Sequence, residues 1–350
     1  MNWFKKLLAI LIIPQFIIVK WLKVNPEIVE KYYSNGLYPI IFELNSFFYS
    51  KVSFSVGDLI YLTLFLSILF QITKFVKNRK FIGYKNFINI GFYSSIIYFF
   101  FHINWGLNYY RIPLNKKFDY EENYSDQELF RLTNKLLLKA NVLHKKLTDN
   151  KNESVKNNYS NNKLFLKINS NFKKILNKKI EISKIKNSIL SKPLSYMGFS
   201  GYLNPLTLES QINDNLPQIN KSATIAHEMS HQFGYALEDE SNFLAFINTY
   251  NNDDDYISYC SYLFAFRYFY SELKLKDVKK SKLIFKKIIP GILINFNESN
   301  EFWKSHQNIF EPIFKTSYDK FLKVNGQKNG IKSYNMMVSL ILAYDKTNPI

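Results

Sequence analysis

Three residues within one short stretch have the types and spacing needed to activate a water molecule. His227 and His231 are four residues apart, and Glu228 directly follows the first of them. Residues at i and i+4 share a face of an α-helix, so both imidazoles can reach one cation. Glu228 is rotated by about 100° around the helix, close enough to hold a water without binding the cation itself. The pattern therefore predicts a zinc site with Glu228 as general base and then general acid.

The alternative interpretation is a chance pair of histidines. Two observations oppose it: the chain has only 5 His, and the residues around the motif are uncharged, as expected for a buried metal helix. These neighbours are Ile225, Ala226, Met229 and Phe233. We assign none of the remaining histidines, His102, His144 and His306, to the metal.

A catalytic zinc usually has three protein ligands and one open position. Acidic candidates follow at Glu238, Asp239 and Glu240. In an unbroken helix Glu238 would share the face of His231 but lie about 10 Å further along the axis. A bend is therefore needed, and Gly234 offers one. We predict Glu238 as the third ligand, with Glu240 as the runner-up; helix-capping carboxylates are the alternative interpretation.

The segment 227–246, HEMSHQFGYALEDESNFLAF, resembles the metal helices of gluzincin-type peptidases. These enzymes pair H-E-x-x-H with a downstream E-x-x-A-[DN] helix. The resemblance implies a zinc metallopeptidase in which Glu238 is the third ligand and Asn242 supports the ligands. The sequence departs from the pattern at Ser241, where Ala is preferred, and in the short separation of the two motifs.

The chain as a whole is similar to a family of uncharacterised bacterial membrane proteins, a domain of unknown function within the zincin superfamily. The similarity covers most of the chain apart from a Lys/Asn-rich stretch, and it implies a fold and a metal site but no substrate. The segments that carry it are 32–34, 39, 54–58, 105–109, 194–205, the His227 region and 330–334.

Zincins commonly place an edge strand before the metal helix, where an extended peptide can add as a further strand. We expect that strand or a turn over 200–204, with Ser200, Gly201 and Tyr202 facing the substrate, although core packing of Tyr202 is an equal alternative. A donor to the oxyanion is also expected. The chain has 25 Tyr, and the candidates among them are Tyr235, Tyr256, Tyr259 and Tyr334.

Three apolar segments precede residue 106, at about 7–22, 56–76 and 87–105, and we predict a transmembrane helix for each. A basic loop without acidic residues joins the second and third segments. Its cations are Lys74, Lys77, Arg79, Lys80 and Lys85. The positive-inside rule places this loop in the cytoplasm, and places 25–55 and everything after 105 outside. We predict a multi-pass protein of the bacterial inner membrane with an extracytoplasmic catalytic domain.

Composition narrows the remaining choices. The formal net charge is +18, but the lysines are scattered and no nucleic-acid module accompanies them, so we expect the lipid bilayer and a peptide or protein substrate as partners and no nucleic acid. The single cysteine, Cys260, excludes an intrachain disulfide. A non-catalytic sensor or scaffold with a structural metal is the alternative function.

The expected fold is mainly α: an anchor with three transmembrane helices over 1–105, then an α+β zincin-like domain with a small sheet over 106–350. Ser125 and Glu128 have capping-box spacing and open a helix to about residue 141. The Lys/Asn-rich residues 149–187 are predicted to be a surface insertion or a partly ordered loop and helix.

Overall fold

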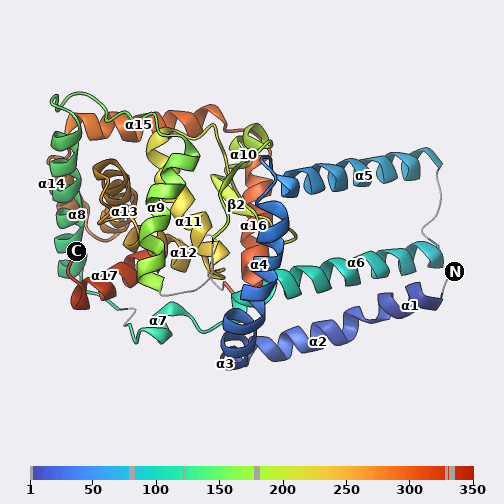
Figure 1. The fold of residues 1–350 in the computed structure, drawn as a ribbon. Coiled ribbons are helices and arrows are strands. Elements are labelled where there is room, and N and C mark those ends of the chain that lie inside the picture. The colour runs from blue at the N-terminus through green and yellow to red at the C-terminus, as the bar shows by residue number, and fades with distance from the viewer. Residues whose placement is uncertain (1–2, 79–82, 121–122, 177–181, 328–329, 331–335) are drawn as a thin grey trace. The chain divides into compact units, whose positions relative to one another are not determined.

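The computed structural model describes residues 3–78, 83–120, 123–176, 182–327, 330 and 336–350. The chain forms two compact units (Figure 1). Unit 1 comprises residues 1–112 together with 204–209, and unit 2 comprises 113–203 and 210–350. We predicted a boundary after residue 105, so the structure extends the first unit by a short segment and adds a distant turn to it.

Unit 1 is helical throughout its described secondary structure. Its elements are α1 (Trp3–Ile10), α2 (Ile12–Lys23), α3 (Pro26–Ile28), the π-helix η1 (Val29–Leu37), α4 (Tyr38–Tyr49), α5 (Val56–Asn78), α6 (Tyr84–Asn104) and the 3-10 helix η2 (Gly106–Tyr110).

Two helices of unit 1, α5 and α6, are long and apolar enough to cross a membrane. The first predicted span, 7–22, is not among the helices that meet this criterion by themselves. Its residues lie in the segment Trp3–Lys23, which pairs with Pro26–Tyr49 across a bend of 96°, and this pair counts as a third span only if the two are taken together. The structure is thus compatible with membrane association. The orientation remains a prediction, and Arg79 and Lys80 of the basic loop lie outside the described residues.

A buried polar cluster lies in unit 1. The Arg111 guanidinium donates two hydrogen bonds to the Glu30 carboxylate, 2.9 Å from Nε to Oε2 and 2.8 Å from Nη2 to Oε1. Ser34 donates to Asn108 Oδ1 at 2.9 Å. The bidentate arrangement neutralises two charges that would otherwise be costly to bury.

The turn 204–209 contacts the start of α5 within the same unit. Glu209 accepts hydrogen bonds from the backbone N–H groups of Gly57 (2.7 Å) and Val56 (3.4 Å). A carboxylate at a helix N-terminus satisfies amide groups that have no partner inside the helix. Gly57 is required here because a Cβ at this position would lie 2.6 Å from Asn204 Nδ2.

Unit 2 contains eleven further helices among its described residues, and a small sheet. The helices are α7 (Leu114–Lys117), α8 (Asp126–Leu147), α9 (Asn161–Leu176), α10 (Ser191–Met197), α11 (Gln218–Gln232), α12 (Glu238–Ile247), α13 (Asp255–Lys276), α14 (Val278–Phe285), α15 (Pro290–Ser305), α16 (Glu311–Val324) and, last, α17 (Met337–Thr347). The first ten of these precede the C-terminal helix α17, which packs on α12 and α13.

Helix α11 is central to unit 2: it contacts α9, α12, α13, α15 and the sheet. Helix α9 comes from the Lys/Asn-rich stretch. It buries Leu164, Ile168 and Phe172, and the Phe172 ring stacks on Phe233 with centroids 5.7 Å apart. The middle of that stretch therefore contributes to the core, because its apolar residues recur every three or four positions and form one face of a helix.

The sheet has the strand order β1 (Lys186–Asn187), β3 (Ser210–Ile212), β2 (Gly201–Leu203). Strands β1 and β3 are parallel, and β2 pairs antiparallel to β3 with Gly201 opposite Ile212. The strand expected over 200–204 is therefore present as β2, and it forms an edge of this sheet.

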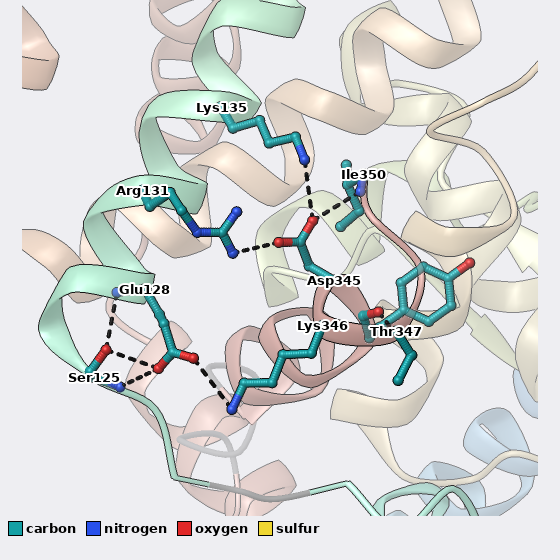
Figure 2. A network of polar contacts seen from close by, with 9 residues as sticks. Ser125, Glu128, Arg131, Lys135, Asp345, Lys346, Thr347 and Ile350 are labelled. Carbon is teal, nitrogen blue, oxygen red and sulfur yellow. Dashed lines mark hydrogen bonds and ion pairs between the residues drawn. The ribbon is translucent and has the colours of Figure 1, made fainter.

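A polar network joins α8 to the C-terminal helix α17 (Figure 2). The predicted capping box is confirmed: Ser125 Oγ accepts from the Glu128 N–H at 3.2 Å, and Glu128 accepts from the Ser125 N–H at 2.8 Å. Helix α8 continues to Leu147, beyond the expected end. Further along it, Arg131 Nη2 donates to Asp345 Oδ2, and Asp345 Oδ1 also accepts from the Ile350 N–H at 2.9 Å.

The Asp345 carboxylate should make unit 2 acid-sensitive. Burial raises the pKa of Asp345, but the hydrogen bonds from Ile350 and Arg131 and the nearby cations outweigh burial and lower it. Its stabilisation is therefore complete above the unfolded pKa, about 3.9, and is lost as the pH falls through the folded pKa. Asp345→Asn should cost about 1–2 kcal/mol at pH 7 and flatten the acid limb of the apparent melting temperature between pH 7 and pH 3.

The matched control is Asp126→Asn, whose carboxylate is 61 % exposed and lies 3.9 Å from Lys276. An equal change in both variants would show that Asp345 has no special part in acid stability.

Candidate metal centre

Helix α11 places the two motif histidines side by side. The imidazole centroids of His227 and His231 are 4.6 Å apart. Both side chains are largely buried, with 14 % and 9 % of their surfaces exposed. Spacing by one helical turn thus gives two ring nitrogens directed at one point.

The chain reverses immediately after this helix at Gly234, as expected. Gly234 has a φ of +79°, in the left-handed region that glycine adopts without strain. Its N–H bonds to the His231 carbonyl at 2.8 Å, and the Tyr235 N–H bonds to the Ser230 carbonyl at 3.3 Å. These two bonds cap α11 and direct the chain into α12, whose first residue is Glu238.

The reversal brings the Glu238 carboxylate to the two histidines. Glu238 Oε2 lies 3.1 Å from His227 Nε2, and Oε1 lies 3.9 Å from His231 Nε2. One donor atom from each of the three residues lies within 4.8 Å of the other two. Ligands at zinc distances of about 2.0–2.2 Å are slightly closer together than this. The donor set and its spacing therefore fit one divalent cation after a small contraction.

The distal nitrogen of each imidazole has its own partner. His227 Nδ1 lies 2.8 Å from Asn242 Oδ1, and His231 Nδ1 lies 2.7 Å from the Tyr235 carbonyl. These acceptors favour the tautomer with the proton on Nδ1, which leaves the Nε2 lone pairs directed at the shared point. The helix cap and α12 thus orient the rings as well as the carboxylate.

Glu228 lies beside this group and is 3 % exposed. Among the described residues its Oε2 atom has no hydrogen-bond partner. Gly201 of β2 approaches it closely: a Cβ on Gly201 would lie 2.8 Å from Glu228 Oε1. Burial raises the pKa of Glu228 to about 8, with His227 opposing the shift and the charge of Glu238 adding to it. A buried carboxylate oxygen without a partner is suited to accept a proton.

The protonation of the three candidate ligands is linked. Burial acts to raise the pKa of Glu238, but His227, His231 and Tyr318 outweigh burial and lower it to about 2. Burial and the neighbouring His227 lower the pKa of His231 to about 4. Burial opposes protonation of His227 as well, yet Glu238 raises its pKa overall. A proton shared by His227 and Glu238 thus occupies the place that suits a cation.

One residue at this site was missed by the sequence analysis. Tyr318 of α16 donates a hydrogen bond from its hydroxyl to Glu238 Oε1 at 2.6 Å. Its ring packs edge-on against Phe199 with centroids 5.1 Å apart. Eighty residues separate Tyr318 from Glu238, so local spacing carried no signal of the contact.

Several sequence candidates lie elsewhere. Glu240, the runner-up ligand, is outside the group and accepts from the Leu114 N–H. Tyr259 donates to Asn295 Oδ1, and Tyr235 serves His231 through its backbone carbonyl. Tyr256 of α13 packs edge-on against the ring of Tyr159. Tyr334 lies outside the described residues. The unassigned histidines also bond elsewhere, each ring contacting a backbone carbonyl: that of Tyr98, Glu153 or Phe302.

A second tyrosine, Tyr268 of α13, is electrostatically coupled to the site. Burial raises the pKa of Tyr268 to about 12, Arg267 opposes the shift, and the charge of Glu238 adds to it. Tyr268 was not among the candidates, because the sequence offered no reason to prefer it over the other tyrosines.

Replacing Tyr318 with Phe should weaken metal binding without unfolding unit 2. The hydroxyl fixes the rotamer of Glu238, and loss of such a contact typically costs 10–100-fold in metal affinity. Competition with a chromogenic chelator would measure the change. Tyr196→Phe is the control, because this tyrosine is 42 % exposed and packs on His306. Equal affinities in the two variants would contradict a role of Tyr318 in orienting the ligand.

A family model described as "Protein of unknown function (DUF3810)" matches residues 33–342. No curated protein and no solved structure gives a significant match to the chain.

Proposed function

The chain belongs to the DUF3810 family, and we propose that it is a membrane-anchored zinc-dependent hydrolase, a peptidase related to the zincins. The observation that carries this proposal is the convergence of His227, His231 and Glu238 beside a buried carboxylate, Glu228, that has an unpartnered oxygen.

The roles of the residues follow from their positions. His227, His231 and Glu238 would hold the cation, which would supply Lewis-acid chemistry by making water more nucleophilic near neutral pH and by polarising a carbonyl. Glu228 accepts the proton of the attacking water and returns it to the leaving amine. Asn242 and the Tyr235 carbonyl keep the histidine rings in place. Tyr318 is a candidate donor to the oxyanion, provided that its hydroxyl turns from Glu238 to the substrate, and Tyr268, whose pKa the charge of Glu238 raises, is a second candidate.

The sheet supports a peptide as the substrate. Strand β2 forms an edge of the sheet, and its residue Gly201 approaches Glu228. An extended peptide paired along such an edge would have its backbone fixed next to the general base. The absence of a side chain at Gly201 keeps that approach open.

The proposed location is the bacterial inner membrane, with unit 2 on the extracytoplasmic side. Helices α5 and α6 are of spanning length, and the basic residues between them favour a cytoplasmic loop.

The second candidate is a non-catalytic sensor or scaffold in which the metal is structural. The position of Glu228 argues against a purely structural metal site. A structural site has no use for a carboxylate buried beside the cation, and burying an ionisable group without partners is costly.

Glu228→Gln is the direct test. It should lower peptide hydrolysis at least about 100-fold, because a positioned general base contributes that much or more, while about one zinc per chain is retained. Cleavage of a peptide library by the detergent-purified protein, read by mass spectrometry, measures the first quantity, and elemental analysis the second.

Two further variants make the result decisive. Glu301→Gln, at a carboxylate that is 72 % exposed, should change neither quantity. The double variant His227→Ala/His231→Ala should lose both metal and hydrolysis. Activity retained in Glu228→Gln would refute the mechanism, and no metal in the parent would refute the site.

Gly201→Ala tests the proximity of the strand to the base. The new Cβ would lie 2.7 Å from the Gln211 carbonyl and 2.8 Å from Glu228 Oε1, so the strand or the carboxylate must move. Hydrolysis should fall by about tenfold or more, since small displacements of a catalytic group are costly, whereas metal content should persist. The control is Gly83→Ala, where a Cβ would meet nothing within 4 Å. Unchanged hydrolysis in Gly201→Ala would contradict this placement of Glu228.

A further inference from the structure

Helix α16 exposes a continuous apolar stripe on unit 2. Exposure ranges from 36 % for Phe314 to 83 % for Ile309. We call this stripe the α16 face; it consists of Ile309 and Phe310, which directly precede the helix, and of Ile313, Phe314, Phe321 and Val324 within it. Large side chains exposed together in this way mark an interaction surface, whereas isolated ones do not.

The stripe has helical spacing. Phe310, Phe314 and Phe321 recur at intervals of four and seven residues, which places them on one side of the helix. Leu322 lies on another side and is fully buried, and Tyr318 beside it reaches Glu238. The helix thus has an inner side that serves the fold and the site, and an outer side that is apolar.

Lys320 borders the apolar stripe, and two further lysines lie on the far side of the helix. Lys315 and Lys323 are 61 % and 51 % exposed, and each pairs with an acidic residue one turn earlier, Glu311 and Asp319. Lys320 is exposed on the same helix. Aromatic and aliphatic residues bordered by lysines are the composition of helices that lie in the interface of a bilayer, with lysines at the level of anionic headgroups.

We propose that the α16 face docks on the surface of a bilayer containing anionic lipid. The chain itself supplies the reason to choose lipid over another partner: α5 and α6 are apolar enough to cross a membrane, and unit 2 is part of the same polypeptide. A tethered surface meets lipid at high effective concentration, so even a modest apolar face is sufficient for docking. This docking does not depend on hydrolysis. Its consequence, that the Tyr318–Glu238 contact is made by a helix at the lipid surface, rests on the proposed function.

A site-specific fluorescent probe on the full-length protein tests the proposal. Ser317 lies within the stripe and is exposed, and Thr316 is exposed on the neighbouring side of the helix. Each would be replaced by Cys and labelled with a polarity-sensitive dye in proteoliposomes of phosphatidylethanolamine and phosphatidylglycerol. The native Cys260 is buried and its pKa is raised to about 12 by burial, so it should not react.

The expected result is that a lipid-borne quencher reduces the Ser317 emission several-fold more than the Thr316 emission, with iodide in water showing the opposite order. Equal quenching of both probes by iodide would overturn the proposal. So would a Ser317 probe that neither quencher reaches, because another protein would then cover the face.

A second variant links the effect to the stripe. Phe310→Ser/Ile313→Ser in the Ser317→Cys protein should reduce lipid quenching to the Thr316 level, and persistent quenching would contradict docking through these residues. Zinc content, measured in the same samples, should be unchanged. Failure of the metal site would appear there and not in the quenching, so the two proposals fail separately.

Discussion

Burying two carboxylates beside each other is the constraint on which the site depends. Glu228 and Glu238 are each less than 5 % exposed, and when both are ionised beside two neutral imidazoles the group carries a charge of −2 that a divalent cation would balance. Without the cation, His227 is held toward its protonated form by Glu238. The surrounding structure reflects this constraint: Gly234 turns the chain, Asn242 orients a ring, and Tyr318 donates to the carboxylate.

The N-terminus of α12 extends the same principle to the neighbouring acids. Glu238, Asp239 and Glu240 are consecutive and all buried. A helix N-terminus favours negative charge, but each carboxylate also has a partner of its own. Glu238 contacts the histidines, Asp239 accepts from Gln327, and Glu240 accepts from the Leu114 N–H. Three adjacent acids thus connect the candidate metal centre, the segment after α16 and the first helix of unit 2.

Local features were predictable because spacing along one element determines them. The capping box of α8, the break at Gly234 and the strand β2 all follow from neighbouring residues. The meeting of His227, His231 and Glu238 required one turn and was expected on the same grounds. Tyr318 could not be predicted, because its contact depends on how α16 packs. The contribution of helix α9 to the core was not predicted, because the many Lys and Asn residues of this segment outnumber the apolar residues of the face that it buries.

The turn 204–209 has a topological consequence. Because this turn belongs to unit 1 while β2 and β3 belong to unit 2, the polypeptide passes between the units at three points: after residues 112, 203 and 209. A single proteolytic cut near residue 112 would break the only covalent link between residues 1–112 and the rest of the chain, but the turn 204–209 would stay on the second fragment and remain hydrogen-bonded to the start of α5 through Glu209. Release of residues 113–350 after such a cut would therefore also require these noncovalent contacts to break, whereas a unit joined by one linker alone would need only the cut.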